Sequence, residues 1–249
     1  MSQGIAMRQL RGWYGTALGQ RVAAAEGAAI GQALAHVGVG DVVHVGPGPE
    51  RLPLSPTARL WRADEGKDLV LDPQQLPFRG QSLEALLLSH VLEFSPDPVA
   101  ILEQAYQTLR PEGRLVVLSF NPLGLWGASR LWGRWRGAAA PWCGRQWTAS
   151  VTGFRLQRAG FQALAVHFLC FRPPFQDQHL QERLDPWEDI GRYFGRLAAG
   201  IQMTIACRRE PGTLDGPGLL EPMAQRFPIR GAQPAGRSEV CRQDSGGAD

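Results

Sequence analysis

The chain has 249 residues, of which 44% are apolar and 20% are charged. This length and composition exclude a wholly disordered chain and allow one substantial hydrophobic core. The 26 basic and 23 acidic residues give a formal net charge of +3, which argues against a nucleic-acid binder on bulk charge.

The termini and the cysteines indicate the compartment. No stretch approaches the ~20 apolar residues of a membrane-spanning helix. Arg8 and Arg11 are not followed by the continuous apolar run of a secretion signal. The four cysteines are too widely spread for a disulfide framework or for a metal site. We therefore expect a cytoplasmic protein with reduced thiols and no metal, and the sequence leaves its oligomeric state open.

The chain divides into three predicted parts. Apolar residues at spacings of three or four predict an N-terminal helical segment over residues 1–37, broken at Gly27 and Gly31. An α/β domain is predicted over residues 38–210. Residues 211–249 are rich in glycine and proline and lack helix or strand periodicity, so we expect a flexible tail.

Short, nearly unbroken apolar runs predict the strands of the central part. They span residues 42–45, 69–71, 86–88, 115–118, 161–171 and 201–207. Asp97 and Pro98 are an N-cap and a first helical residue, and they predict a crossover helix that ends before Pro111. A second helix is predicted to end at Gly160. The pattern favours an open, mostly parallel, doubly wound α/β sheet.

Ligands of such sheets bind beyond the carboxyl ends of the strands. The first strand is followed by Gly46-Pro47-Gly48, whose two glycines let the backbone approach a ligand closely, although an ordinary tight turn explains them too. Residues 46–57, which lead to the next strand, contain four prolines. We therefore expect this crossover to lack a regular helix.

The order of several motifs resembles the class I S-adenosylmethionine-dependent methyltransferases, and more narrowly the methyltransferase type 11 group. A bacterial subfamily of that group also has Asn-Pro after its fifth strand. The motifs lie within about residues 40–170, and they are Gly46-Pro47-Gly48, the segments 72–78 (DPQQLPF) and 88–94 (LSHVLEF), the Asp97-capped helix, 109–115 (LRPEGRL) and 121–127 (NPLGLWG).

This resemblance implies an S-adenosyl-L-methionine site. Gly46, Pro47 and Gly48 would lie against the methionine part of the cofactor. Asp64, or its neighbour Glu65, would accept hydrogen bonds from the ribose hydroxyls. In the same comparison Asp72 would pair with the adenine amino group.

The resemblance also implies residues nearer the reaction. Leu76 would pack on the adenine ring, and Ser89 would face the sulfonium. His90 is the best candidate for a general base, although a histidine satisfied by hydrogen bonds at a strand end is an equally open interpretation. The family normally has an acidic residue where this chain has His44, which we expect to be a hydrogen-bonded core histidine.

A segment rich in tryptophan and arginine follows the predicted fifth strand. Residues 126–147 hold five of the eight tryptophans, four arginines and no acid. By resemblance, Asn121, Trp126 and Trp132 would belong to a lid over the acceptor. Packing of the tryptophans on the sheet, stacking on unpaired bases and contact with a membrane interface are the alternatives.

Two functions remain open at this point. The first is a methyltransferase that uses S-adenosylmethionine and acts on an unidentified acceptor, such as a small molecule. The second is a degenerate methyltransferase fold that serves as a binding or scaffolding protein, which His44 and the shortened crossover favour. A nucleic-acid-binding function depends on the tryptophan and arginine segment alone.

Overall fold

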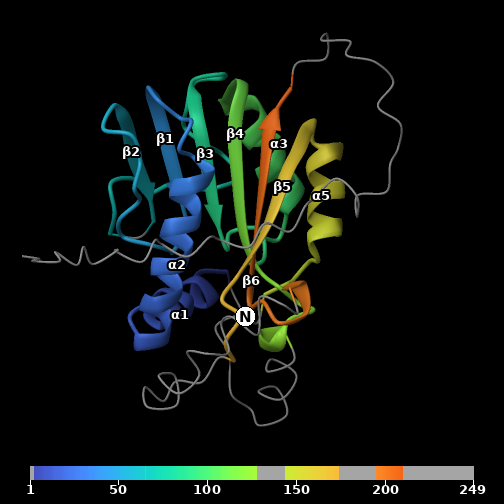
Figure 1. Cartoon of the computed structure of the whole chain (residues 1–249). Helices are drawn as coiled ribbons and strands as arrows, with labels where there is room; N and C mark the ends of the chain where they lie inside the picture. The colour runs from blue at the N-terminus through green and yellow to red at the C-terminus, as the bar shows by residue number, and fades with distance from the viewer. Residues whose placement is uncertain (1–2, 65, 128–143, 174–194, 210–249) are drawn as a thin grey trace, which may run out of the picture.

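The computed structural model describes residues 3–64, 66–127, 144–173 and 195–209. Its strands form one sheet in the spatial order β2-β1-β3-β4-β6-β5 (Figure 1). They are β1 (Gly40–Val45), β2 (Ala58–Ala63), β3 (Leu83–Ser89), β4 (Leu109–Phe120), β5 (Phe161–Leu169) and β6 (Ile201–Arg208). The helices are α1 (Gln3–Tyr14), α2 (Ala17–Ala33), α3 (Pro98–Thr108), α5 (Ala149–Arg158) and the short 3-10 helix η1 (Gly195–Leu197).

The strand pairing confirms the predicted open, mostly parallel α/β sheet. Strands β1 to β4 are parallel, and β6 runs antiparallel to both β4 and β5. The chain moves outward from β1 to β2 and then crosses to β3 on the other side of β1. The order therefore switches between β1 and β3, which is where doubly wound sheets bind ligands.

The prediction of a strand at residues 69–71 is wrong. Leu69 makes one isolated parallel bridge to Ala63, and the chain then leaves the edge of the sheet. The side chain of Asp68 accepts a hydrogen bond from the backbone N–H of Arg62 (2.9 Å), so this N–H is not available to a neighbouring strand. A turn then begins at Asp72 and ends any further pairing. β2 is therefore the outermost named strand on this side.

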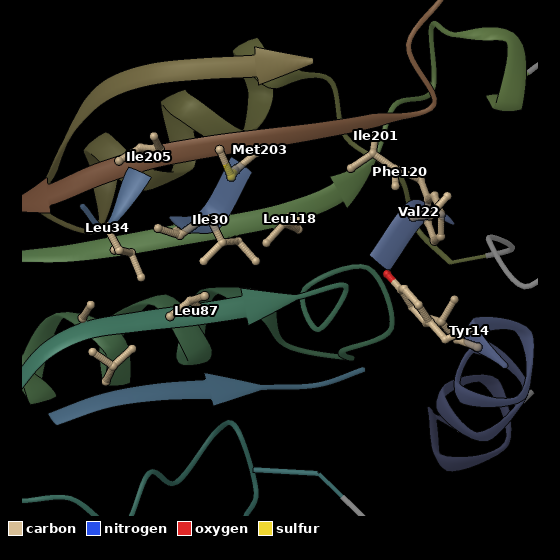
Figure 2. Close-up of a cluster of buried hydrophobic side chains, with 14 of the residues drawn as sticks. Tyr14, Val22, Ile30, Leu34, Leu87, Leu118, Phe120, Ile201, Met203 and Ile205 are labelled. Carbon is tan, nitrogen blue, oxygen red and sulfur yellow. The ribbon is translucent and has the colours of Figure 1, made fainter. Parts of the chain in front are cut away.

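Alternate residues of each strand face two hydrophobic cores. One face packs against α1 and α2, and the other packs against α3 and α5. In Figure 2, Ile30 of α2 lies beside Leu118 of β4 and Met203 of β6. Among the described residues, no helix is both long enough and apolar enough to span a membrane.

Local capping signals place the helices on the second face. Asp97 accepts hydrogen bonds from the backbone N–H groups of Val99 and Ala100, both at 3.1 Å, which confirms it as the N-cap of α3. The predicted stop of α5 at Gly160 is also confirmed, since the chain turns there with a φ of +94°.

The predicted break of the N-terminal helix at Gly27 and Gly31 is wrong, because α2 passes through both. The break lies at Thr16, which caps α2 by accepting from the backbone N–H of Gly19 (3.1 Å). The two glycines instead allow close packing. A Cβ at Gly31 would lie 2.3 Å from Cγ of Pro53, in the crossover after β1.

The described crossover at residues 46–57 contains no helix, as its four prolines predicted. Helix α2, which precedes β1 in the chain, lies against it. A Cβ at Gly27 would be 3.2 Å from the carbonyl oxygen of Arg51. Thus a helix from the N-terminal segment covers this side of the sheet.

A buried polar cluster fixes this segment to the strand ends. Tyr14 of α1 donates to both carboxylate oxygens of Glu26 in α2, at 3.0 and 2.9 Å. His90, directly after β3, lies 3.2 Å from Glu26 through Nε2 and 2.9 Å from Glu93 through Nδ1. Glu93 also accepts from the backbone N–H of Phe120 at 2.7 Å. We call the four side chains Tyr14, Glu26, His90 and Glu93 the buried acid cluster.

The buried acid cluster keeps His90 charged. Burial lowers the pKa of His90, but the charges and hydrogen bonds of Glu93 and Glu26 outweigh it and raise the pKa from 6.5 to about 9. Burial and the adjacent Glu26 raise the pKa of Tyr14 above its ordinary value, so its hydroxyl stays protonated. The charge of His90 in turn helps to lower the pKa of His44 in β1.

We predict that stability falls in alkaline solution because His90 loses its proton. A pKa that is higher in the folded state gives stabilisation that is complete below about pH 6.5 and is lost as the pH rises through about 9. The loss is on the order of 3 kcal/mol. Urea unfolding across this pH range measures it. The loss should be much smaller in His90→Gln and unchanged in the control His36→Gln, whereas equal slopes in all three proteins would refute the assignment.

A second prediction concerns the contact between α2 and the crossover. Gly31→Ala should lower the free energy of unfolding by about 1–3 kcal/mol, because the new methyl group meets Pro53. Gly12→Ala is the matched control, since nothing lies within 4 Å of its added Cβ. That change should raise the free energy of unfolding by about 0.5–1 kcal/mol through helix propensity. Two changes of the same sign would contradict the close packing.

Candidate functional site

A cavity of about 520 Å³ lies between the N-terminal helices and the carboxyl ends of β1 and β2. Its volume is in the range of ligand pockets. The helical part contributes backbone and side chains from residues 11 to 23, and the strand ends contribute the rest. The lining residues are Arg11, Tyr14, Gly15, Gln20, Ala23, His44, Gly46, Pro47, Gly48, Pro49, Glu50, Arg62, Asp64 and Lys67.

The predicted glycine turn forms one wall of this cavity. Gly46 has a φ of +96°, and a Cβ there would lie 2.3 Å from the carbonyl oxygen of Ser89. A Cβ on Gly48 would lie 3.1 Å from the ring of His44. Only glycine fits at position 46. Glycine at position 48 leaves no side chain between the backbone and the ring of His44. Gly46, Pro47 and Gly48 thus form a cradle that side chains would fill.

Asp64 follows β2 directly and also lines the cavity. Its Oδ1 accepts from Nε of Arg11 at 2.7 Å, and it lies 2.5 Å from a terminal nitrogen of the same guanidinium. The Asp64 side chain is 11% exposed. The neighbouring alternative, Glu65, lies outside the described residues.

His44 and Ser89 join the ends of β1 and β3. His44 is buried, and its Nε2 lies 2.8 Å from Oγ of Ser89. Burial, aided by the nearby charge of Arg62, lowers the pKa of His44 to about 4. The imidazole is therefore neutral near pH 7, as a hydrogen-bonded core histidine should be. Ser89 is fully buried and lies behind His44, outside the lining of the cavity.

The two residues predicted to hold adenine do not line this cavity. Asp72 is exposed, and its Oδ1 accepts from the backbone N–H of Gln74 at 2.9 Å. Leu76 is buried in the core shared with α3. The structure thus separates this pair from Gly46 and Asp64, which it brings together.

The structure places His90 away from the cavity. Its side chain is fully buried, and both ring nitrogens lie within hydrogen-bonding distance of carboxylates. A φ of +55° turns the chain after β3 so that this ring points inward. The geometry thus disagrees with the prediction of a base that faces the acceptor and agrees with its alternative, a histidine satisfied at a strand end.

The predicted lid residues are part of the core where they are described. Asn121 donates from its side chain to the carbonyl oxygens of Arg196 (2.5 Å) and Ala199 (3.0 Å). Trp126 is 1% exposed, and its indole N–H donates to the carbonyl oxygen of Arg172 at 2.8 Å. Buried side chains cannot move over a ligand, so neither forms a lid in this structure. Trp132 lies outside the described residues.

Arg11, Tyr14 and Glu26 were missed by sequence reasoning. They belong to two amphipathic helices whose pattern predicts only a buried face, and each meets its partner through the tertiary fold. One signal was available for Glu26, which is an acidic residue on the apolar stripe that contains Val22 and Ile30. A buried carboxylate needs a partner, so that position already predicted a polar cluster.

Part of the chain matches known proteins. The family model described as a methyltransferase domain matches residues 22–117. The uncharacterized protein YafS of Escherichia coli K12 is 38% identical over 60 residues, which are 24% of this chain and 25% of that protein. The match therefore spans about a quarter of the length of each protein.

A solved methyltransferase structure shares the fold. A chain of the complex between the Haloferax volcanii Trm112 methyltransferase activator and a methyltransferase superposes with a TM-score of 0.50, at 17% identity over 72% of this chain and 88% of that one. An S-adenosylmethionine-dependent methyltransferase from Archaeoglobus fulgidus is similar over 73% of this chain and 94% of its own, with 15% identity and a TM-score of 0.47. The chain therefore matches the model of a methyltransferase domain over residues 22–117 and shares the fold of a solved methyltransferase.

Proposed function

We propose that this chain binds S-adenosyl-L-methionine in the cavity beside α1 and α2 and transfers its methyl group to a small-molecule acceptor. The single observation that carries the proposal is the meeting of Gly46, Gly48 and Asp64 around one cavity of ligand size. These are the residues that the family resemblance assigned to the methionine and ribose ends of the cofactor.

The residues present fit the ribose and methionine ends of the cofactor. The backbone at Gly46 and Gly48 can approach a ligand because no side chain stands in the way. The Asp64 carboxylate can accept hydrogen bonds from two vicinal hydroxyls. Arg11 holds that carboxylate in a fixed orientation before a ligand arrives. Asp72 and Leu76 stay predictions for the adenine end.

The chemistry asks little more of the protein. When bound, the cofactor supplies a methyl group that its sulfonium already activates. The chain must hold an acceptor close to it and exclude water. His44 lines the cavity as a neutral imidazole, and such a ring could donate or accept a hydrogen bond to orient an acceptor there. The identity of the acceptor and its reacting atom are left open by these residues.

The predicted segments, location and alternative partner of the chain are consistent with this proposal or remain predictions. The helical segment of residues 1–37 would belong to the active unit, because Arg11 and Tyr14 line the cavity. The flexible tail predicted for residues 211–249 lies outside the described residues. A cytoplasmic location, and nucleic acid as an alternative partner, stay predictions from the sequence.

We predict that Asp64 is required for cofactor affinity. Asp64→Asn should weaken binding of S-adenosylhomocysteine by about 1–3 kcal/mol, because an ionised acceptor of hydrogen bonds is lost. Isothermal titration calorimetry measures the dissociation constants. Glu103→Gln, an exposed change on α3, is the control and should bind as the wild type does. Unchanged affinity in Asp64→Asn would place the ribose elsewhere.

A parallel prediction tests the adenine end. Asp72→Ala should weaken binding of the same ligand by about 1–3 kcal/mol through the lost adenine hydrogen bond. Equal affinities of Asp72→Ala and the wild type would move the adenine site away from Asp72. If neither S-adenosylmethionine nor S-adenosylhomocysteine gives heat or a thermal shift with the wild type at millimolar concentration, the proposal fails and the scaffolding alternative takes its place.

A further inference from the structure

The charges around the cavity do not suit a cationic ligand by themselves. Among the described residues, the two carboxylates that line it are already paired, Asp64 with Arg11 at 2.5 Å and Glu50 with Lys67 at 3.7 Å. Arg62 adds a further positive charge. His44, which also lines the cavity, is neutral. A ligand that carries a sulfonium therefore meets a wall whose described residues have an excess of positive charge.

The buried acid cluster holds the opposite excess. Glu26 and Glu93 supply two negative charges, and the doubly hydrogen-bonded imidazolium of His90 offsets one of them. Tyr14 donates to Glu26 but remains neutral. One negative charge is therefore left over in side chains that water reaches barely or not at all, where an uncompensated charge is costly.

This excess negative charge lies next to the cavity. Tyr14 lines the cavity and bonds to both oxygens of Glu26. Ala23, which also lines it, lies one helical turn before Glu26 on α2. Figure 2 shows the hydroxyl oxygen of Tyr14 directed toward α2. The cluster and the cavity thus share a wall made by Tyr14 and this turn of α2.

We propose that Glu26, acting through Tyr14, supplies the negative charge that lets this cavity prefer a sulfonium cation over a neutral thioether. This inference rests on the proposed function and deepens it. Tyr14 is the contact residue, and Glu26 is a positioning residue that acts through it. The acid comes from α2, whereas the usual family position at the end of β1 is occupied by the neutral His44.

The physical argument is a charge balance. A cation in the cavity compensates the charge that the buried acid cluster leaves over, so both gain from the pairing. The attraction is little weakened by solvent because the cluster is buried. S-adenosylmethionine and S-adenosylhomocysteine differ in the methyl group and its positive charge. Their ratio of affinities therefore isolates the effect of charge from that of ligand shape.

The test compares two dissociation constants in three proteins by calorimetry, with S-adenosylmethionine and S-adenosylhomocysteine as the ligands. Glu26→Gln removes the extra charge and keeps an acceptor for Tyr14. It should weaken S-adenosylmethionine relative to S-adenosylhomocysteine on the order of tenfold. Glu50→Gln, which removes an exposed carboxylate from the same cavity, is the matched control. It should change the ratio by less than about twofold, because solvent screens that charge.

A measurement on the wild type covers the case in which Glu26→Gln does not fold. The preference for S-adenosylmethionine over S-adenosylhomocysteine should not fall between low and high salt, since a buried charge is not screened, whereas screening of the positive groups on the cavity wall can only raise it. A ratio that falls with salt would assign the selectivity to the exposed carboxylates and overturn the inference.

The outcomes separate this inference from the proposed function. If the wild type binds both ligands and a folded Glu26→Gln keeps the wild-type ratio, the role of Glu26 is refuted while the proposed function stands. If the wild type binds neither ligand, both are refuted. A tenfold change in Glu26→Gln, together with a preference for S-adenosylmethionine that does not fall with salt, supports both.

Discussion

The shape of the cavity depends on the hydrogen bonds of the Glu26 carboxylate. It lies on α2, is fully buried, and binds Tyr14 of α1 on one side and His90 after β3 on the other. These bonds hold two helices from the start of the chain against strand ends formed much later. Because α1 and α2 form one wall of the cavity, the polar cluster that fixes them also shapes the cavity.

The crossover after β1 shows why this arrangement is needed. Four prolines between residues 46 and 57 prevent the helix that usually follows the first strand of such folds. Helix α2 lies against that segment, and Gly27 and Gly31 allow the close approach. This arrangement buries the charged side chains of the buried acid cluster, which nonpolar packing alone would not require. It also gives the cavity a wall that carries Arg11 and Tyr14.

Features that depend on neighbouring residues could be predicted from the sequence. The cap at Asp97, the stop at Gly160 and the alternation of the strands all follow from local chemistry. Features that depend on distant partners could not. Gly31 allows Pro53 to pack closely against α2, and a turn after Leu69 ends its pairing with the sheet. His90 forms a hydrogen bond with Glu26, a carboxylate 64 residues away in the chain. The same limit explains why Trp126 belongs to the core, since its partner is the carbonyl of Arg172.

The protein therefore has a methyltransferase fold, and its N-terminal helices form one wall of the cavity in which we propose that the cofactor binds. A crystal structure of the full chain with bound S-adenosylhomocysteine tests this most directly. We expect density for the ligand between α1 and the Gly46-Pro47-Gly48 turn, with its ribose hydroxyls on Asp64 and the contacts of Glu26 to Tyr14 and His90 intact. Ligand bound at another place on the chain, or a cavity filled by side chains at saturating ligand, would contradict the account.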